Sequence, residues 1–253
     1  METRVILTAF VAVLLLVSCA PTAPREHGDG HGESTGTKEE ALTIEDVSGP
    51  AEVSFQIKDG DNVFQDFGVS HTKEMHLIAV RDDLRHFHHL HPERDARGIW
   101  HIPFTPSTGG TYWFYADFVD GQKSSHTIRF ERTYESAPGP YGIKEDSETM
   151  REVEGYRFAL KTEKHGNEIA FTYNITDAAG ASVELEEYLG AQGHSVLIAP
   201  SGAFVHTHPS TALSTSPSEG SGSPVFRTPL PDEPFFRTFT QFQIKGKVVT
   251  VAF

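Results

Sequence analysis

The 253-residue chain contains a single cysteine, Cys19, so no disulfide bond can form within one molecule. It also has no excess of basic residues, because 21 Lys and Arg stand against 35 Asp and Glu and the formal net charge is −14. A chain with this charge is poorly suited to nucleic acid. It contains no glycine-rich phosphate loop and no nucleophile motif of a hydrolase. We therefore expect a protein that does not bind nucleic acid and is not an enzyme.

An apolar run lies at the N-terminus. Residues 5–17 follow the positive Arg4 and are too few to span a bilayer, but they are typical of a signal-peptide core. The run ends in Leu16-Val-Ser-Cys19, which resembles the lipobox of bacterial lipoproteins, in which the cysteine receives the lipid. We predict a lipoprotein signal peptide over residues 1–19, lipidation of Cys19 and export. Ala20 stands where lipoproteins retained at the inner membrane usually carry aspartate, so we expect the outer membrane, facing the periplasm, in a Gram-negative cell.

Residues 20–44 have the composition of a disordered tether. They are rich in Pro, Gly, Thr and charged residues and have no apolar periodicity. His27 and His31 lie there among Gly, Asp and Glu, and such tracts can capture metal loosely. A solvated linker explains the same composition, so these two histidines are secondary candidates for metal binding.

The remainder of the chain repeats itself. Four sequence blocks recur in the same order, 117 to 124 residues apart. Ordered recurrence of four blocks indicates a tandem duplication. We predict repeats over residues 45–133 and 150–253, joined by a linker over residues 134–149. The blocks begin at Val53, His76, Phe87 and Tyr112 in the first repeat, and at Phe171, His194, Phe204 and Phe236 in the second.

Both repeats are predicted to be all-β. Phe55 and Ile57 alternate with polar residues, as do Tyr173 and Ile175. Residues 111–118 are dense in aromatic side chains, which suit a half-buried strand. Short strands separated by turn residues predict two tandem immunoglobulin-like antiparallel β-sandwich domains.

Histidines recur inside the duplicated blocks. If residues 76–81 and 86–91 form a hairpin, direct pairing places His76 opposite His91 and Ile78 opposite His89. Residues two apart on a strand share a face, and opposed Cβ atoms lie about 4.5–5.5 Å apart, so three imidazoles can converge. The second repeat gives the same arrangement. The candidate metal ligands are His76, His89 and His91 in the first repeat, and His194, His206 and His208 in the second.

Three neutral imidazoles beside apolar residues suit a transition metal. We expect copper first and zinc second, because a set of histidines alone does not separate the two. Met75 could add a thioether that favours copper(I), and His86 and His88, on the opposite face, are further candidates; these extras could make the first site the stronger one. Histidines can also be ordinary packing residues, but core packing does not require imidazole at three matched positions. The unmatched His71, His101, His126 and His165 are interpreted as ordinary residues.

The segments from Met75 to Pro92 and from Tyr188 to Pro209 resemble exported bacterial proteins with immunoglobulin-like domains of the YtkA/FixH kind. These proteins are linked to the handling of copper or heavy metals in the cell envelope. The resemblance implies a metal-binding role without a reaction. Expected partners are the membrane, through the lipid, and proteins of metal efflux or delivery.

Two other functions stay open. The two domains could be a metal-free scaffold that holds its histidines inside the core. A cupin-like metalloenzyme is the other, because His86-Phe-His88 followed by Glu93 resembles the first cupin motif. The second repeat has no acid at that spacing. We therefore expect a membrane-anchored protein that buffers or delivers a metal in the cell envelope, or confers resistance to it.

Overall fold

The computed structural model describes residues 41–143, 145–209, 223–229 and 232–253. Within these ranges the chain has no helix and forms four antiparallel sheets. In these ranges there is no helix long and apolar enough to cross a membrane. The predicted signal peptide, Cys19, His27 and His31 lie outside the described residues. The described residues belong to one compact unit.

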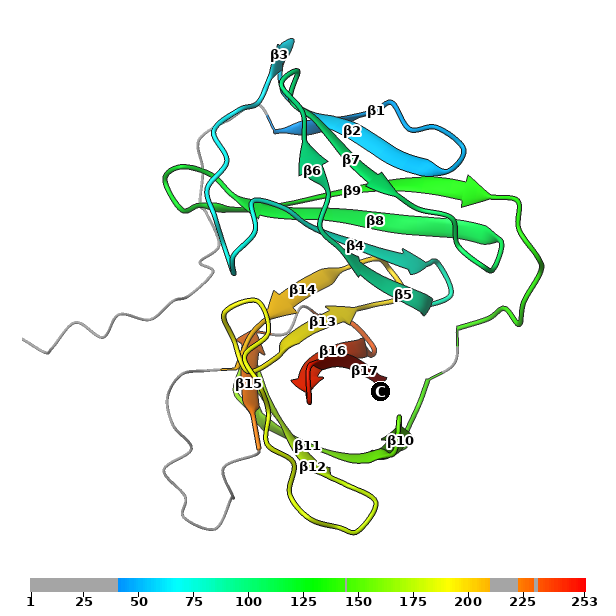
Figure 1. Ribbon diagram of the computed structural model, residues 1–253, viewed down its shortest axis with the longest axis vertical. Helices are drawn as coiled ribbons and strands as arrows, with labels where there is room; N and C mark the ends of the chain where they lie inside the picture. Colours follow the sequence, from blue (N-terminus) through cyan, green and yellow to red (C-terminus); the bar gives the residue numbers. More distant parts are fainter. Residues whose placement is uncertain (1–40, 144, 210–222, 230–231) are drawn as a thin grey trace, which may run out of the picture. The chain divides into compact units, whose positions relative to one another are not determined.

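The first repeat is a sandwich of two sheets. Its strands are β1 (Thr43–Asp46), β2 (Glu52–Asp59), β3 (Asn62–Val63), β4 (His76–Arg81), β5 (Arg85–Leu90), β6 (Glu93–Arg94), β7 (Ile99–Pro103), β8 (Gly110–Val119) and β9 (Ser125–Tyr134). One sheet has the order β1-β2-β7-β6, with β3 beside β2, and the other has the order β5-β4-β8-β9 (Figure 1). This is the strand order of an immunoglobulin sandwich. Strand β1 begins two residues before the predicted start of the repeat.

The second repeat has the same plan. Its strands are β10 (Met150–Val153), β11 (Tyr156–His165), β12 (Glu168–Thr176), β13 (His194–Ile198), β14 (Phe204–Thr207), β15 (Val225–Pro229), β16 (Arg237–Ile244) and β17 (Lys247–Ala252). The sheets have the orders β10-β11-β12-β15 and β14-β13-β16-β17. Strands β13, β14, β16 and β17 therefore correspond to β4, β5, β8 and β9. The prediction of two tandem antiparallel β-sandwiches is confirmed.

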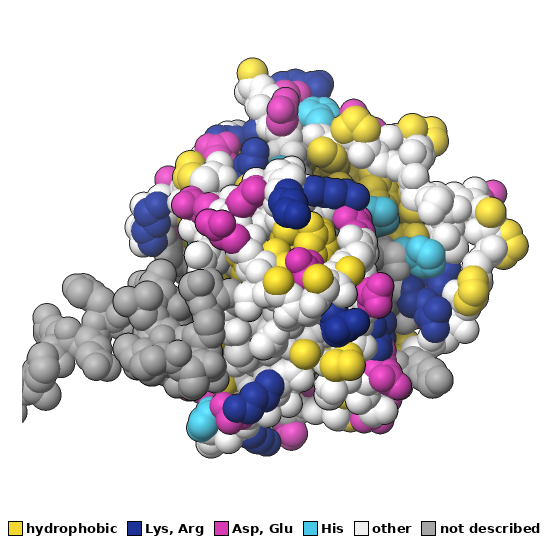
Figure 2. All heavy atoms as spheres, turned by 60° about the horizontal axis from the view of Figure 1, so that its bottom comes forward, with side chains coloured by type: hydrophobic (Ala, Val, Ile, Leu, Met, Phe, Trp, Pro, Cys, Tyr) yellow, Lys and Arg dark blue, Asp and Glu magenta, His cyan; other side chains and the backbone are white. Residues whose placement is uncertain are grey.

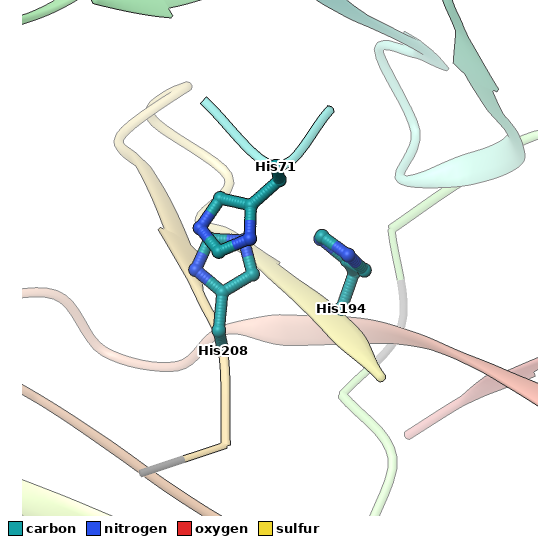
Figure 3. Close-up of side chains that lie close together, drawn as sticks. All are labelled: His71, His194 and His208. Atoms are coloured by element: carbon teal, nitrogen blue, oxygen red, sulfur yellow. The ribbon is translucent and has the colours of Figure 1, made fainter. Parts of the chain in front are cut away.

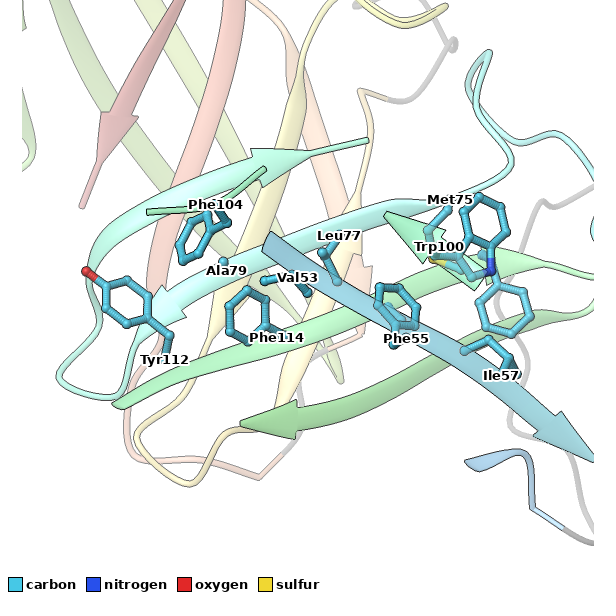
Figure 4. Close-up of a cluster of buried hydrophobic side chains, with 12 residues drawn as sticks. Val53, Phe55, Ile57, Met75, Leu77, Ala79, Trp100, Phe104, Tyr112 and Phe114 are labelled. Atoms are coloured by element: carbon cyan, nitrogen blue, oxygen red, sulfur yellow. The ribbon is translucent and has the colours of Figure 1, made fainter. Parts of the chain in front are cut away.

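Each sandwich has its own core. In the first repeat, Phe55 and Ile57 of β2 face Leu77 of β4 and Phe114 of β8, and all four side chains are fully buried (Figure 4). The predicted alternation of apolar and polar residues along β2 explains this face, since successive side chains on a strand point to opposite sides. The core of the second repeat includes Phe171, Tyr173 and Ile175 of β12, Leu197 of β13 and Phe242 of β16.

A third core joins the two repeats. Strands β4 and β13 are buried along their whole length, on both faces. Leu77 and Ala79 face the first sandwich, whereas Ile78 and Val80 pack with residues of the second repeat. We call this the inter-repeat core. Its buried members are Ile78, Val80, Leu84, Tyr115, Val196, Ile198 and Phe239.

Two ring stacks show that the inter-repeat core is symmetric. Phe87 of β5 stacks on Phe239 of β16, with ring centroids 4.5 Å apart. Phe204 of β14 stacks on Tyr115 of β8, also at 4.5 Å. Because β5 corresponds to β14 and β8 to β16, this is one contact made twice. An approximate twofold axis therefore relates the two facing sheets.

Phe239 allows a test of the inter-repeat core, because its side chain is 4% exposed and stacks on Phe87. Phe239→Ala should lower the free energy of unfolding by about 3 kcal/mol, since buried Phe→Ala changes remove apolar contacts and leave a cavity. Phe239→Leu, which keeps most of the volume, should cost clearly less. Urea denaturation followed by circular dichroism measures both. A loss under about 1 kcal/mol for the alanine variant, the size of an ordinary substitution, would contradict the assigned packing.

Candidate metal centre

The two hairpins that carry the histidines have the predicted register. In the hairpin of β4 and β5, Ile78 pairs with His89, and in that of β13 and β14, Val196 pairs with His206. A β-bulge near the turn of the first hairpin is an added feature. Ile78 and Val196 both belong to the inter-repeat core. The histidine face of each hairpin is therefore the face turned towards the other repeat.

All six predicted ligands consequently lie on the faces by which the repeats pack together, and the histidines of each hairpin stay near one another. The ring centroids of His76 and His206 are 5.5 Å apart, and those of His89 and His194 are 6.0 Å apart. A seventh histidine, His71, lies with them. We call the seven residues the histidine cluster: His71, His76, His89, His91, His194, His206 and His208.

The first site consists of His76, His89 and His91, whose ligand atoms lie within 4.8 Å of one another. The Nε2–H group of His76 donates to the carbonyl oxygen of Ser70 at 3.1 Å, and the Nδ1–H group of His89 donates to Oε1 of Gln241 at 2.7 Å. A neutral imidazole has only one N–H. His76 Nδ1 and His89 Nε2, which face each other at 2.9 Å, are therefore both acceptors.

The second site repeats this arrangement. The Nε2–H group of His194 donates to the carbonyl oxygen of Tyr188 at 2.9 Å, and the Nδ1–H group of His206 donates to a carboxylate oxygen of Asp117 at 2.8 Å. His194 Nδ1 and His206 Nε2 then face each other at 3.4 Å. In neutral rings these two atoms are again both acceptors.

Two further nitrogens complete the pattern. Nε2 of His91 and Nε2 of His208 are buried and have no hydrogen-bond partner among the described residues. A buried nitrogen without a partner costs about 1–3 kcal/mol. Ligand nitrogens about 2.0–2.1 Å from a tetrahedral ion lie about 3.3 Å apart, close to the 2.9 and 3.4 Å between the facing nitrogens. Each site therefore offers inward nitrogens at a spacing that suits one ion.

His71 was not identified from the sequence. It comes from the loop before β4, and its ligand atom lies within 4.8 Å of those of His194 and His208 (Figure 3). Its ring stacks on that of His208 with centroids 3.5 Å apart. The offset of 118 residues aligns His71 with Leu189, and both residues have positive φ, 48° and 51°. The loop thus recurs in both repeats, but the histidine does not. His71 was therefore left out of the predicted ligands, because unmatched histidines were interpreted as ordinary residues.

Three secondary ligand candidates, Met75, His86 and His88, lie apart from the histidine cluster. Met75 is 1% exposed and packs in the core of the first sandwich, beside Leu77 (Figure 4). The ring of His88 packs against Phe104, with centroids 5.1 Å apart, and neither His88 nor His86 joins a metal-binding group within the described ranges. Neighbouring strand residues point to opposite faces, so these side chains leave the strands away from the cluster. In the second site the ligand atoms within 4.8 Å of one another belong to His71, His194 and His208, and the predicted ligand His206 adjoins this group through its 3.4 Å contact with His194.

Burial favours the neutral form of five histidines of the cluster. Desolvation lowers the pKa of His76 and lowers that of His89 well below its ordinary value. It also lowers the pKa of His91 to about 4 and that of His194 to about 3. The pKa of His208 is lowered for the same reason, helped by the neighbouring imidazoles. These rings are therefore in the ligand-competent form at neutral pH.

These shifts predict an acid-sensitive fold. Unfolded histidines have pKa values near about 6.5, so below that pH the unfolded chain binds more protons than the folded chain, and stability falls as pH falls. We expect the urea midpoint of chelator-treated protein to drop between pH 7 and pH 5. Carboxylates act mainly below about pH 5, because their unfolded pKa values lie near 4. His91→Gln should flatten this slope, and His165→Gln, at an exposed position on β11, should not. A midpoint that is constant over this range would contradict the expectation.

The fold and the cluster define a tandem immunoglobulin-like protein that encloses histidines from both repeats. The family described as Domain of unknown function (DUF8832) matches the chain twice, over residues 36–136 and 151–253, and the chain belongs to this family. Among curated proteins none matches the chain.

Several solved structures are similar at low identity. A tetra-tandem repeat from the extending region of a large adhesion protein aligns at 10% identity and a TM-score of 0.27, over 84% of this chain and 48% of that one. This chain thus spans about half the length of that adhesion-protein chain. A marsupial T cell receptor aligns at 10% identity and a TM-score of 0.25, over 87% and 98% of the two chains. Dimeric latent PorU from Porphyromonas gingivalis aligns at 13% and 0.24, over 85% and 19%.

Proposed function

We propose that this protein binds transition-metal ions in the histidine cluster and has no enzymatic activity of its own. One observation carries the proposal. In both repeats, oxygen atoms hold the outer N–H groups of two imidazoles, whose inner nitrogens then face each other at 2.9 and 3.4 Å. A metal ion is the simplest group that would turn this repulsion between lone pairs into attraction.

A proton between the facing nitrogens would also remove the repulsion. In the first site, however, that proton would leave a positive charge on a buried imidazole. Desolvation lowers the pKa values of both His76 and His89 and so disfavours this protonation. A proton would also leave Nε2 of His91 unpartnered. An ion accepts lone pairs from all three rings at once, which favours metal over proton.

The ligands point to copper or zinc. Imidazole donors suit both ions, and the position of Met75 in the sandwich core removes the thioether that favoured copper(I). The resemblance to YtkA/FixH-type proteins keeps copper as our first choice and zinc as the second. His206 also bonds Asp117, and a carboxylate that accepts from a ligand histidine strengthens that histidine as a ligand.

The charged side chains on one face of the molecule are mixed in sign. On the face in Figure 2, Lys and Arg side chains lie among Asp and Glu side chains, so the net charge of −14 is not collected there in one acidic patch. The lipobox supports an anchor at Cys19, and Ala20 supports the outer membrane, facing the periplasm, if the cell is Gram-negative. There it would buffer the metal or pass it to proteins of metal efflux or delivery.

Metal analysis tests the proposal. The untagged chain, with Cys19→Ala to prevent lipidation, is stripped with chelator, dialysed against micromolar copper or zinc, and measured by elemental analysis. We expect one ion per site in the wild type. His91→Ala combined with His208→Ala should remove most of the metal, because each site loses an inward nitrogen.

The matched control is His101→Ala combined with His165→Ala, which removes two histidines outside the cluster and should retain the metal. Circular dichroism checks that all variants fold. If the wild type holds no more metal than the His91/His208 variant, the metal function is wrong and the metal-free scaffold becomes the better explanation.

A further inference from the structure

The two sites differ at one matched position outside their ligands. Asp117 on β8 pairs with His76 and accepts the N–H of His206 from the second repeat. Gln241 on β16 pairs with His194 and accepts the N–H of His89 from the first repeat. Each repeat thus supplies the residue that orients a ligand of the other repeat.

The next residue outward is the same in both sites. Thr127 of β9 pairs with Asp117 and donates its hydroxyl to Oδ1 at 2.7 Å. Thr250 of β17 pairs with Gln241 and accepts from Nε2 at 3.1 Å. The surroundings are therefore duplicated, and the principal difference at this position is a carboxylate in one site and a neutral amide in the other.

That difference has a direct effect on ligand strength. A carboxylate that accepts the outer N–H of an imidazole makes the inner nitrogen a better donor, and its negative charge attracts the cation. An amide oxygen orients the ring but adds no charge. The site with Asp117 also has the imidazole of His71 close to His194 and His208. The residue of the second repeat that matches His71 is Leu189, which offers no imidazole to the first site.

We propose that the two sites are unequal and fill in order. A divalent ion of the copper or zinc class binds first at the second site, with Asp117 as its positioning residue. The first site, oriented by Gln241, binds the next ion more weakly and exchanges it more readily. This inference rests on the proposed function and adds a division of labour, in which one ion is retained and the other is available for transfer.

The test exchanges the two residues in the full untagged Cys19→Ala chain. Zn²⁺ is titrated against a chromophoric chelator, and Co²⁺ provides an absorption spectrum for each site. We expect two classes of affinity in the wild type. Asp117→Asn should weaken the tighter class about 10–100-fold, the usual effect of changing such a partner. Gln241→Glu should strengthen the weaker class, which loss of structure cannot imitate.

The assignment of affinities to sites needs ligand variants. His91→Ala should leave the tighter class and its Co²⁺ spectrum, and His208→Ala should disturb them. Glu131→Gln, at an exposed position on β9, is the control for charge and should leave both classes unchanged.

Two results would overturn the inference alone: two ions bound with equal affinity, or an effect of Asp117→Asn no larger than that of Glu131→Gln. Wild-type protein that binds neither Zn²⁺ nor Co²⁺ would overturn the proposed function together with it.

Discussion

The structure depends on the packing of two sheets face to face in the inter-repeat core. That packing buries β4 and β13 on both sides, so their residues serve two cores in alternation. His76 and His194 begin these strands and are 2% and 1% exposed. Histidines on this face are shielded from solvent because the other repeat covers them. The cluster is therefore a consequence of how the repeats pack, and neither repeat has the same site by itself.

Burial of two imidazoles and partial burial of five others in an apolar interface require hydrogen bonds in return. The outer nitrogens find them at the carbonyl groups of Ser70 and Tyr188 and across the interface at Asp117 and Gln241. The inner nitrogens face one another instead. A scaffold that needed only packing would gain by replacing these rings with apolar ones, as in the adjoining Phe stacks. Under the proposed function, a metal ion would use these inner nitrogens.

Much of this could be predicted from the sequence, because duplication and strand period are local signals. The repeats, the sandwich fold, the hairpin registers and the shared face of His89 and His91 follow from spacing alone. The surface that packs on that face cannot be predicted from the spacing. The continuous apolar run after His76 is typical of a strand buried on both sides, but it does not say by what. Asp117 aligns with Gln241 at an offset of 124 residues, yet their role requires the other repeat. Met75 precedes His76 in sequence, but consecutive residues along a strand point to opposite faces, so its side chain lies away from the cluster.

The tandem arrangement explains why the two sites can differ at all. In a symmetric homodimer the same residue occupies both halves of the interface, so an acid on one side is an acid on the other. Here the approximate twofold axis relates two different stretches of one chain, and each position can change alone. Asp117 differs from Gln241, and His71 from Leu189, while the threonines beside them occupy matched positions and the carbonyl groups have the same role in both sites. Both differences favour the same site. If the histidines bind metal as proposed, the duplicated frame offers two equivalent sites, and these two differences make them unequal.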